Sequence, residues 1–221
     1  MDKIYLSLTT RPERLISHHF NKVYNSLLNQ TQTFNKLIIN LSIKEFTYEI
    51  PDYLHTANVI LNETDICGPC TKLFGSIDII PDNTVVIILD DDIVMKDNFI
   101  KSLYDSYLIN TNKVSSHFTT TSFYGNYLEV AGFGGYIFNI NNIRNIKHFY
   151  NEMPLCCRYI DDNWISWCIN KLGVSVINTI ETNAWNNVLD IRNTNPHPDW
   201  FELCKNTNRI ELIKEMFSIL K

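Results

Sequence analysis

The 221-residue chain contains no run that approaches the roughly 18 consecutive apolar residues of a membrane-spanning helix, so we expect no membrane span. It also lacks an excess of basic residues. Its 19 Lys and Arg against 24 Asp and Glu give a formal net charge of −5, which does not favour binding to nucleic acid. The N-terminus lacks the charged and apolar regions of a signal peptide. Together these absences predict a cytoplasmic protein, of the producing cell or of its host.

A disulfide framework is not expected, because six cysteines in a chain of this length without an export signal favour free thiols. Residues 67–70 form Cys-Gly-Pro-Cys, the tetrapeptide of a thioredoxin redox centre. Thioredoxins also need a later cis-proline, and no proline lies between Pro81 and Pro154. A zinc site that joins this pair to Cys156 and Cys157 is a weaker alternative than free thiols, because adjacent cysteines make a poor half-site.

Strand-like apolar runs alternate with helical patterns through the first half of the chain. This alternation favours one α/β domain over residues 1–221, with a mainly parallel sheet, flanking helices and right-handed crossovers. The predicted strands are Lys3–Leu8, Lys36–Ser42, Asn58–Leu61, Thr84–Leu89 and Val174–Asn178. The predicted helices are one to about Gln30 with a Thr10/Glu13 capping box, Lys72–Ile79, one capped by Asp97, Asp161–Leu172 and Arg209–Leu220.

Three aspartates follow the most apolar predicted strand, at the edge where such sheets bind their ligands. Asp90, Asp91 and Asp92 repel one another at the mouth of Thr84–Leu89, and a divalent cation relieves that repulsion. Carboxylate oxygens suit Mg²⁺ or Mn²⁺, which typically bridge to phosphate oxygens. The alternative interpretation is a solvated acidic turn that caps the next helix.

A second acidic pair, Asp161 and Asp162, begins a predicted helix, where the helix dipole by itself favours negative charge. The functional interpretation is that one of them is a general base, which accepts the proton of a hydroxyl nucleophile beside an aromatic wall of Trp164 and Trp167. The Gly-Phe-Gly-Gly stretch at 132–135 lacks the spacing of a dinucleotide fingerprint. Its glycines indicate either a close approach of backbone to a ligand or a tight turn.

Taken in order, these pieces resemble a family of small GT-A-fold glycosyltransferases, family 2-like, of bacteria and large DNA viruses. The matching segments are Leu6–Arg11, Gly68–Leu73, Ile88–Asp92, Gly132–Gly135 and Asp161–Trp164. The resemblance implies a nucleotide-binding half over about 1–92 and an acceptor and catalytic half over about 93–221. It also implies metal-dependent transfer, with Mn²⁺ or Mg²⁺, of a sugar from a nucleotide-sugar donor. A UDP-sugar is the favoured donor, and a glycan or other small hydroxyl compound the acceptor.

The resemblance further implies roles for individual residues. Asp162 would be the catalytic base of an inverting reaction, with Asp161 beside it. Asp90 would contact the ribose, and Asp92 would ligate the metal together with Asp90. The implied nucleotide-sugar-binding residues are Thr9, Thr10, Arg11, Lys72, Asp90, Asp91, Gly134 and Gly135. His197 is a further candidate metal contact, although a rigid surface turn between two prolines is the favoured interpretation there.

Two other functional classes stay open from the sequence. An apolar strand followed by Asp-x-Asp also occurs in haloacid-dehalogenase-type phosphatases, in which Asp90 would be the nucleophile and Asp92 the acid/base. In that family the nucleophile strand comes early, whereas here about 80 residues and three predicted strands precede the strand that ends before Asp90. The other class is a non-catalytic sugar-binding domain with this fold, against which the two intact acidic pairs argue.

Overall fold

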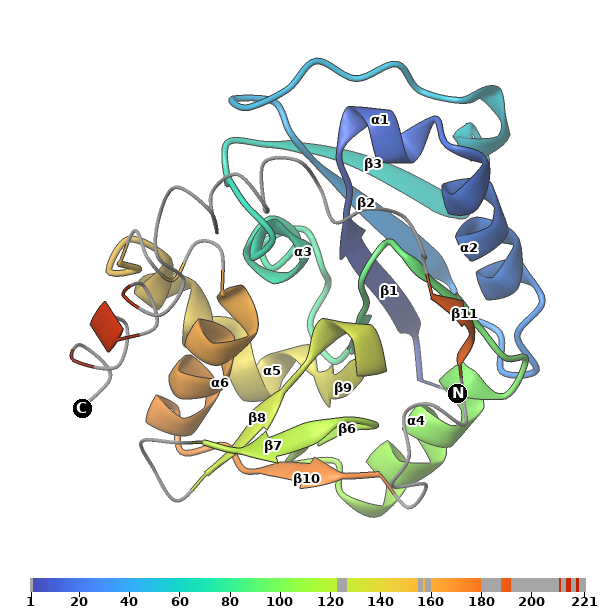
Figure 1. Ribbon diagram of the computed structural model, residues 1–221. Helices are drawn as coiled ribbons and strands as arrows, with labels where there is room; N and C mark the ends of the chain where they lie inside the picture. The colour runs from blue at the N-terminus through green and yellow to red at the C-terminus, as the bar shows by residue number, and fades with distance from the viewer. Residues whose placement is uncertain are drawn as a thin grey trace.

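Seven strands form a mixed sheet in the order β10-β6-β9-β4-β1-β2-β3 (Figure 1). The computed structural model describes residues 2–122, 127–154, 157, 160–179, 188–191, 211, 214–215 and 218. Neighbouring strands run parallel except for β9, which is antiparallel to both β4 and β6. The prediction of a single α/β domain with a mainly parallel sheet flanked by helices is confirmed.

The sheet strands are β1 (Ile4–Thr9), β2 (Lys36–Ser42), β3 (Val59–Thr64), β4 (Val85–Ile88), β6 (Val114–Ser116), β9 (Tyr136–Asn139) and β10 (Val176–Asn178). Two short antiparallel pairs lie outside it: β5 (Ile93–Met95) with β11 (Val188–Ile191), and β7 (Thr119–Thr121) with β8 (Leu128–Val130). The helices are α1 (Pro12–Leu15), α2 (His18–Leu28), α3 (Thr71–Phe74), α4 (Phe99–Ile109), α5 (Ile140–Ile143) and α6 (Asp161–Lys171). The 3-10 segments are η1 (Asp52–Leu54), η2 (Gly132–Gly134) and η3 (Arg144–Tyr150). No helix among the described residues is long and apolar enough to cross a membrane.

Helices cover both faces of the sheet, because its central strands carry apolar side chains on both sides. On one face, α2 and α4 pack against residues such as Leu6 and Ile87. On the other face, α3, α5 and α6 pack against Val86 and Ile88. The alternation of these side chains along β4 therefore produces two apolar cores, one on each side of the sheet.

The first predicted helix is divided in the structure, and its predicted capping box is wrong. Arg11 occupies the N-cap of α1 without a side-chain capping bond, and Ser17 caps α2 by accepting from the N–H of Phe20 at 3.1 Å. The hydroxyl of Thr10 instead donates to the buried carboxylate of Asp91 at 2.6 Å. A carboxylate that is buried needs donors, and this requirement outweighs the local capping preference.

The predicted helix over Lys72–Ile79 is also shorter than expected, since α3 ends at Phe74. The carbonyl of Gly75 accepts a hydrogen bond from the side chain of Asn62 at 2.8 Å. Beyond Phe74 the backbone continues in turns, with bonds such as that from the N–H of Ser76 to the carbonyl of Leu73 at 3.2 Å. His197 and most of the predicted helix over 209–220 lie outside the described residues.

The antiparallel strand β9 brings the glycine stretch to the candidate site. Its first residue, Tyr136, pairs with Ile88, the last residue of β4. Because the two strands run in opposite directions, the residues just before β9 lie beyond the carboxyl end of β4. Gly132 is therefore placed next to Asp90, although 42 positions separate them in the sequence.

Candidate active site

The side chain of Lys72, in α3, lies at the centre of the predicted site. Its Nζ donates hydrogen bonds to Asp90 Oδ1 at 2.8 Å and to Asp162 Oδ1 at 3.1 Å. Asp161 Oδ2 lies 3.0 Å from the same nitrogen. Only 2% of Lys72 is exposed to solvent. Carboxylates from the end of β4 and from the first turn of α6 therefore converge on one buried ammonium group.

Gly132 links two of these carboxylates through its backbone. Its N–H donates to Asp162 Oδ2 at 3.1 Å, and its carbonyl accepts from the N–H of Asp90 at 3.2 Å. A Cβ atom at this position would lie 2.3 Å from Asp90 Oδ1 and 2.5 Å from Lys72 Nζ, closer than real Cβ atoms approach their neighbours. Gly132, Asp90, Lys72 and Asp162 form a closed ring of interactions, and a Cβ at position 132 would displace the ends of the Asp90 and Lys72 side chains.

Burial and the neighbouring charges shift the pKa values in this cluster. Burial raises the pKa of Asp162, Lys72 lowers it, and the charges of Asp161 and Asp90 raise it again, to a net value of about 7. Burial also raises the pKa of Asp161, an effect that Lys72 partly offsets. Burial alone would lower the pKa of Lys72, but its three carboxylate neighbours raise it well above the ordinary value. The cluster thus combines a lysine that stays charged with two carboxyl groups whose pKa values are raised.

Arg14, in α1, holds the other aspartates of the 90–92 run. It forms an ion pair with Asp91 and lies 3.6 Å from Asp92 Oδ2. Asp91 is only 6% exposed and also accepts the hydroxyl hydrogen of Thr10. Of the three aspartates, Asp91 is therefore fastened to α1 and to the loop after β1, whereas the side chains of Asp90 and Asp92 remain 29% and 30% exposed.

The loops after β1 and β2 bring two further groups to this edge of the sheet. The guanidinium of Arg11 lies 4.8 Å from the ring centre of Phe46, and both residues are partly exposed. The Tyr48 hydroxyl donates to the carbonyl of Thr10 at 3.0 Å. The side chain of Thr9 binds the neighbouring strand, since its hydroxyl donates to the carbonyl of Asn40 at 2.9 Å.

The two other predicted glycines pack against protein in this structure. A Cβ at Gly134 would lie 2.7 Å from the Cβ of Phe118. Gly135 has a φ of +68°, and a Cβ there would meet the side chains of Phe99, Leu103 and Leu89. Trp164, predicted to line an aromatic wall, is 2% exposed and stacks on Trp167 with 4.8 Å between ring centroids. These residues support the site from the core.

The donor atoms of the site suit a hard divalent cation bridged by a substrate. Arg14 and Lys72 pair with the carboxylates of residues 90–92 and 161–162. Within the described residues, no three side chains form a ready-made metal cage. Mg²⁺ usually takes only one or two carboxylates and completes its shell with water and phosphate oxygens. The partly exposed Asp90 and Asp92 fit that mode.

The Cys-Gly-Pro-Cys stretch lies beside this site, not within it. Cys67 and Cys70 are free thiols, as are Cys157 and Cys168, while the other two cysteines lie outside the described residues. Cys70 is fully buried, and its thiol donates to the carbonyl of Cys67 at 3.3 Å. The stretch forms the turn that begins α3 and so helps to place Lys72.

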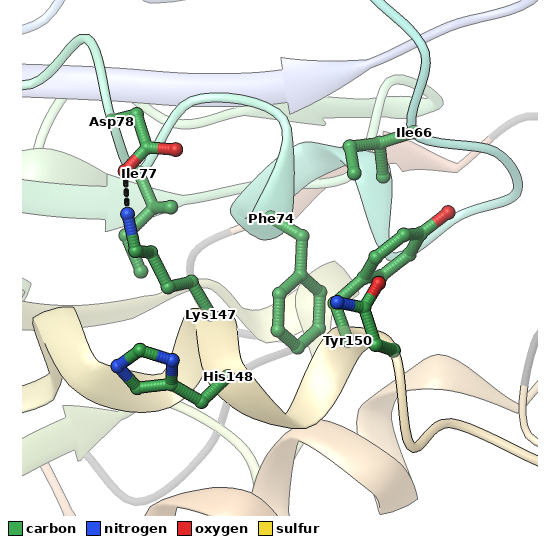
Figure 2. Close-up of a pocket in the computed structure, with 8 residues that line it drawn as sticks. Ile66, Phe74, Ile77, Asp78, Lys147, His148 and Tyr150 are labelled. Carbon is green, nitrogen blue, oxygen red and sulfur yellow. Dashed lines mark hydrogen bonds and ion pairs between the residues drawn. The ribbon is translucent and has the colours of Figure 1, made fainter.

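A hollow of about 280 Å³ lies between α3 and η3 (Figure 2). Phe74 and Tyr150 form its aromatic side, with 5.5 Å between their ring centroids. Lys147 and Asp78 form an ion pair of 2.7 Å at its rim. None of the site residues predicted from the sequence lines this hollow.

Sequence reasoning missed two residues of the candidate site. Arg14 carries no sequence signal that distinguishes it from Arg11, and only the fold shows which of them meets Asp91. Gly132 was within a recognised glycine stretch, but the stretch does not show which glycine approaches a charged group. A strand predicted directly after residue 135, antiparallel to Thr84–Leu89, would have singled out position 132.

No protein-family model matches the chain, and no curated protein sequence matches it. Its fold, in contrast, matches 204 solved chains. One is the 4-diphosphocytidyl-2C-methyl-D-erythritol synthase of Anaerococcus prevotii, with 11% sequence identity and a TM-score of 0.53 over 94% of this chain and 97% of that one. At this identity the match shows a shared α/β fold. Such a widely used fold leaves the reaction to be argued from the site.

Proposed function

We propose that this protein is a nucleotide-sugar-dependent glycosyltransferase that uses a divalent metal. The observation that carries the proposal is the convergence of Asp90, Asp161 and Asp162 on Lys72 at the carboxyl end of β4. Ligands of open α/β sheets bind at this edge. An acidic group with a pKa near 7, next to exposed carboxylates that suit a metal, supports group transfer to a hydroxyl nucleophile.

On the donor side, residues after β1, β2 and β4 would hold the nucleotide. A ring such as Phe46 with the guanidinium of Arg11 over it offers a stacking surface for a base. Asp90 would hydrogen-bond the ribose, and Asp92 with Asp90 would hold Mg²⁺ or Mn²⁺. The bound metal would supply positive charge to the diphosphate leaving group. A UDP-sugar is the donor that we expect.

On the acceptor side, Asp162 would act as the general base. A hydroxyl group of the acceptor would attack the anomeric carbon and lose its proton to the carboxylate of Asp162, while the bond from that carbon to the diphosphate breaks. The N–H of Gly132 and the ammonium of Lys72 would hold this carboxylate in place. Attack from the face opposite the leaving group gives an inverting reaction, with a glycan or another hydroxyl compound as acceptor.

A panel of nucleotide-sugars tests this proposal. We expect one UDP-sugar to raise the apparent melting temperature only when Mn²⁺ is present, and EDTA to remove the effect, because ligand binding stabilises the folded state. The same donor should then release UDP. Hydrolysis of p-nitrophenyl phosphate that Asp90→Asn abolishes would instead indicate a phosphatase. Donor binding without any release of UDP would indicate a non-catalytic sugar-binding domain.

Nucleotidyl transfer is the second candidate, and the fold match favours it. The matched synthase is named for a diphosphocytidyl product. In a nucleotidyl transfer by this protein, a phosphate group of the acceptor would attack the α-phosphorus of a nucleoside triphosphate, the bond between the α- and β-phosphates would break, and pyrophosphate would leave. Assaying both leaving groups separates the two functions: UDP from a UDP-sugar indicates glycosyl transfer, and pyrophosphate from a nucleoside triphosphate indicates nucleotidyl transfer.

A further inference from the structure

We propose that Lys72 is a positioning residue, which joins Asp90 on the donor side to Asp162 on the acceptor side, and that it does not bind the phosphates of the donor. This inference rests on the proposed function. It changes the role that the sequence implied for Lys72, which was contact with the nucleotide. It also assigns Gly132 the role of holding Lys72 and the carboxylates of Asp90 and Asp162 in fixed relative positions.

The contacts of the Lys72 ammonium group are the first evidence for this positioning role. An ammonium group has three N–H donors and no acceptor. Its three nearest carboxylate oxygens, on Asp90, Asp161 and Asp162, lie at 2.8, 3.0 and 3.1 Å. The contacts to Asp90 and Asp162 are hydrogen bonds, and the contact to Asp161 is an ion pair. A lysine that bound phosphate would need an open approach to its nitrogen, whereas Lys72 is 2% exposed.

The backbone of Lys72 is fixed as well, which is what a positioning residue needs. Its carbonyl accepts the hydroxyl hydrogen of Ser7, in β1, at 2.7 Å. Asn40, in β2, donates to the same hydroxyl oxygen at 2.9 Å, and Ser7 and Ser76 lie within hydrogen-bond distance at 3.0 Å. These groups are fully buried, so the start of α3 is tied to two neighbouring strands of the sheet.

Hydrogen bonds through Gly132 link the donor-side carboxylate of Asp90 to the acceptor-side carboxylate of Asp162. The backbone of one residue, Gly132, accepts from the N–H of Asp90 through its carbonyl and donates through its N–H to the side chain of Asp162, while Lys72 binds the side chains of both. A displacement of any member therefore moves the donor-side and acceptor-side carboxylates relative to each other. A misplacement of about 1 Å between reacting groups can cost about 100-fold in rate.

The test separates binding from turnover in two variants, Lys72→Met and Gly132→Ala. The affinity for UDP with MnCl₂ is measured by calorimetry. The turnover rate is measured with whichever of UDP-glucose, UDP-galactose and UDP-N-acetylglucosamine the wild type turns over fastest. Gly132→Ala keeps every charge and perturbs only the ring, so it decides the question if Lys72→Met does not fold. Lys147→Met, which removes a lysine paired with Asp78 at the surface, is the matched control.

For both variants we expect kcat to fall by about 100-fold, with the dissociation constant of UDP changed by less than about fivefold. The control should change neither quantity. A loss of UDP affinity of about tenfold or more in Lys72→Met would show that the lysine binds phosphate and overturn the inference. An unchanged kcat in either folded variant would overturn it too. If the wild type itself binds no UDP, the proposed function fails, and the inference fails with it.

Discussion

The two basic residues of the candidate site hold the same run of aspartates in different ways. Lys72 is 2% exposed and binds Asp90 together with the pair from α6. Arg14 has a side chain that is 21% exposed, and it holds Asp91 firmly and Asp92 at a longer distance. The lysine cluster joins three segments of the chain around one buried charge, whereas the arginine pair fastens one loop to a short helix.

This difference divides three adjacent aspartates that are identical in the sequence. Asp91 is buried and satisfied by Arg14 and Thr10, so its task in this structure is to hold the loop. Asp90 and Asp92 keep part of their carboxylates open to solvent, where a ligand can reach them. Asp91 and Asp92 lie in the turn between β4 and β5, and from this turn the Asp91 side chain reaches Arg14 and Thr10.

Removing the central charge should have the largest effect. In Lys72→Met, three carboxylates lose their shared cation, and we expect the free energy of unfolding to fall by about 3 kcal/mol or more at pH 7. Urea denaturation measures it. The surface control Lys147→Met should lose less than about 0.5 kcal/mol. Adding Asp161→Asn to Lys72→Met should recover part of the loss, since it removes one of the unpaired charges. Equal stability of Lys72→Met and wild type would contradict the importance of the cluster.

Removing the proposed base should affect the rate more than the stability. We expect Asp162→Asn to lower kcat by about 1,000-fold with little change in UDP affinity. Its side chain is 30% exposed, and an amide can keep the bond from Gly132, so the fold should persist. Initial rates at saturating donor measure the effect, and circular dichroism checks the fold. A variant with near wild-type kcat would exclude Asp162 as the base.

The same residue gives the wild-type rate a pH dependence. Because the pKa of Asp162 is raised to about 7, its carboxylate form, the one that accepts a proton, becomes populated as the pH rises through that value. We expect kcat/KM to rise from about pH 6 and to level off above about pH 8. A rate that is flat across this range would contradict a base with this environment.

The ion pair of Arg14 with Asp91 should contribute less to the free energy of unfolding than the lysine cluster. In Arg14→Met, Asp91 loses its ion pair but keeps the hydroxyl hydrogen of Thr10, so we expect a loss of about 2 kcal/mol in unfolding free energy. Urea denaturation again measures it, with Lys101→Met as an exposed control. A loss greater than that of Lys72→Met would reverse the order that the structure indicates.

Replacing the cysteines should have the smallest effect on activity. The thiols of Cys67 and Cys70 donate to the backbone carbonyls of Asp65 and Cys67, at 3.4 and 3.3 Å. We expect the double change to Ala to keep kcat within about twofold of wild type. Burial of Cys70 predicts a modest loss of stability, about 1 kcal/mol. An inactive double variant that is still folded would show that a thiol takes part in the chemistry.

Hydrophobic periodicity was sufficient to predict most of the sheet. Lys36–Ser42 agrees in full with β2, and the continuous apolar run at Thr84–Leu89 contains β4. Such runs are informative because a strand covered on both faces has few other ways to bury them. Helix boundaries were predicted less well. Ser17 caps the second part of the first predicted helix, and Asn62 binds the carbonyl of Gly75, which follows α3.

The members of the candidate site were partly predictable, but their partners were not. The acidic runs at 90–92 and 161–162 and Lys72 stand out by composition and order. Asp90, Asp161 and Asp162 meet around the Nζ atom of Lys72. This meeting depends on how the fold places the end of β4 and the start of α6, which no local pattern specifies. Thr10 was predicted to cap a helix, but its hydroxyl binds Asp91 instead. This difference has the same origin, because the two residues are about 80 positions apart in the sequence.

A crystal structure of the protein with UDP and Mn²⁺ would test the central claim most directly. We expect the diphosphate beside Asp90 and Asp92, with the Lys72 ammonium still on the carboxylates of Asp161 and Asp162. A complex in which UDP binds away from the end of β4, or in which Lys72 has turned from the carboxylates to bind the phosphates, would contradict it.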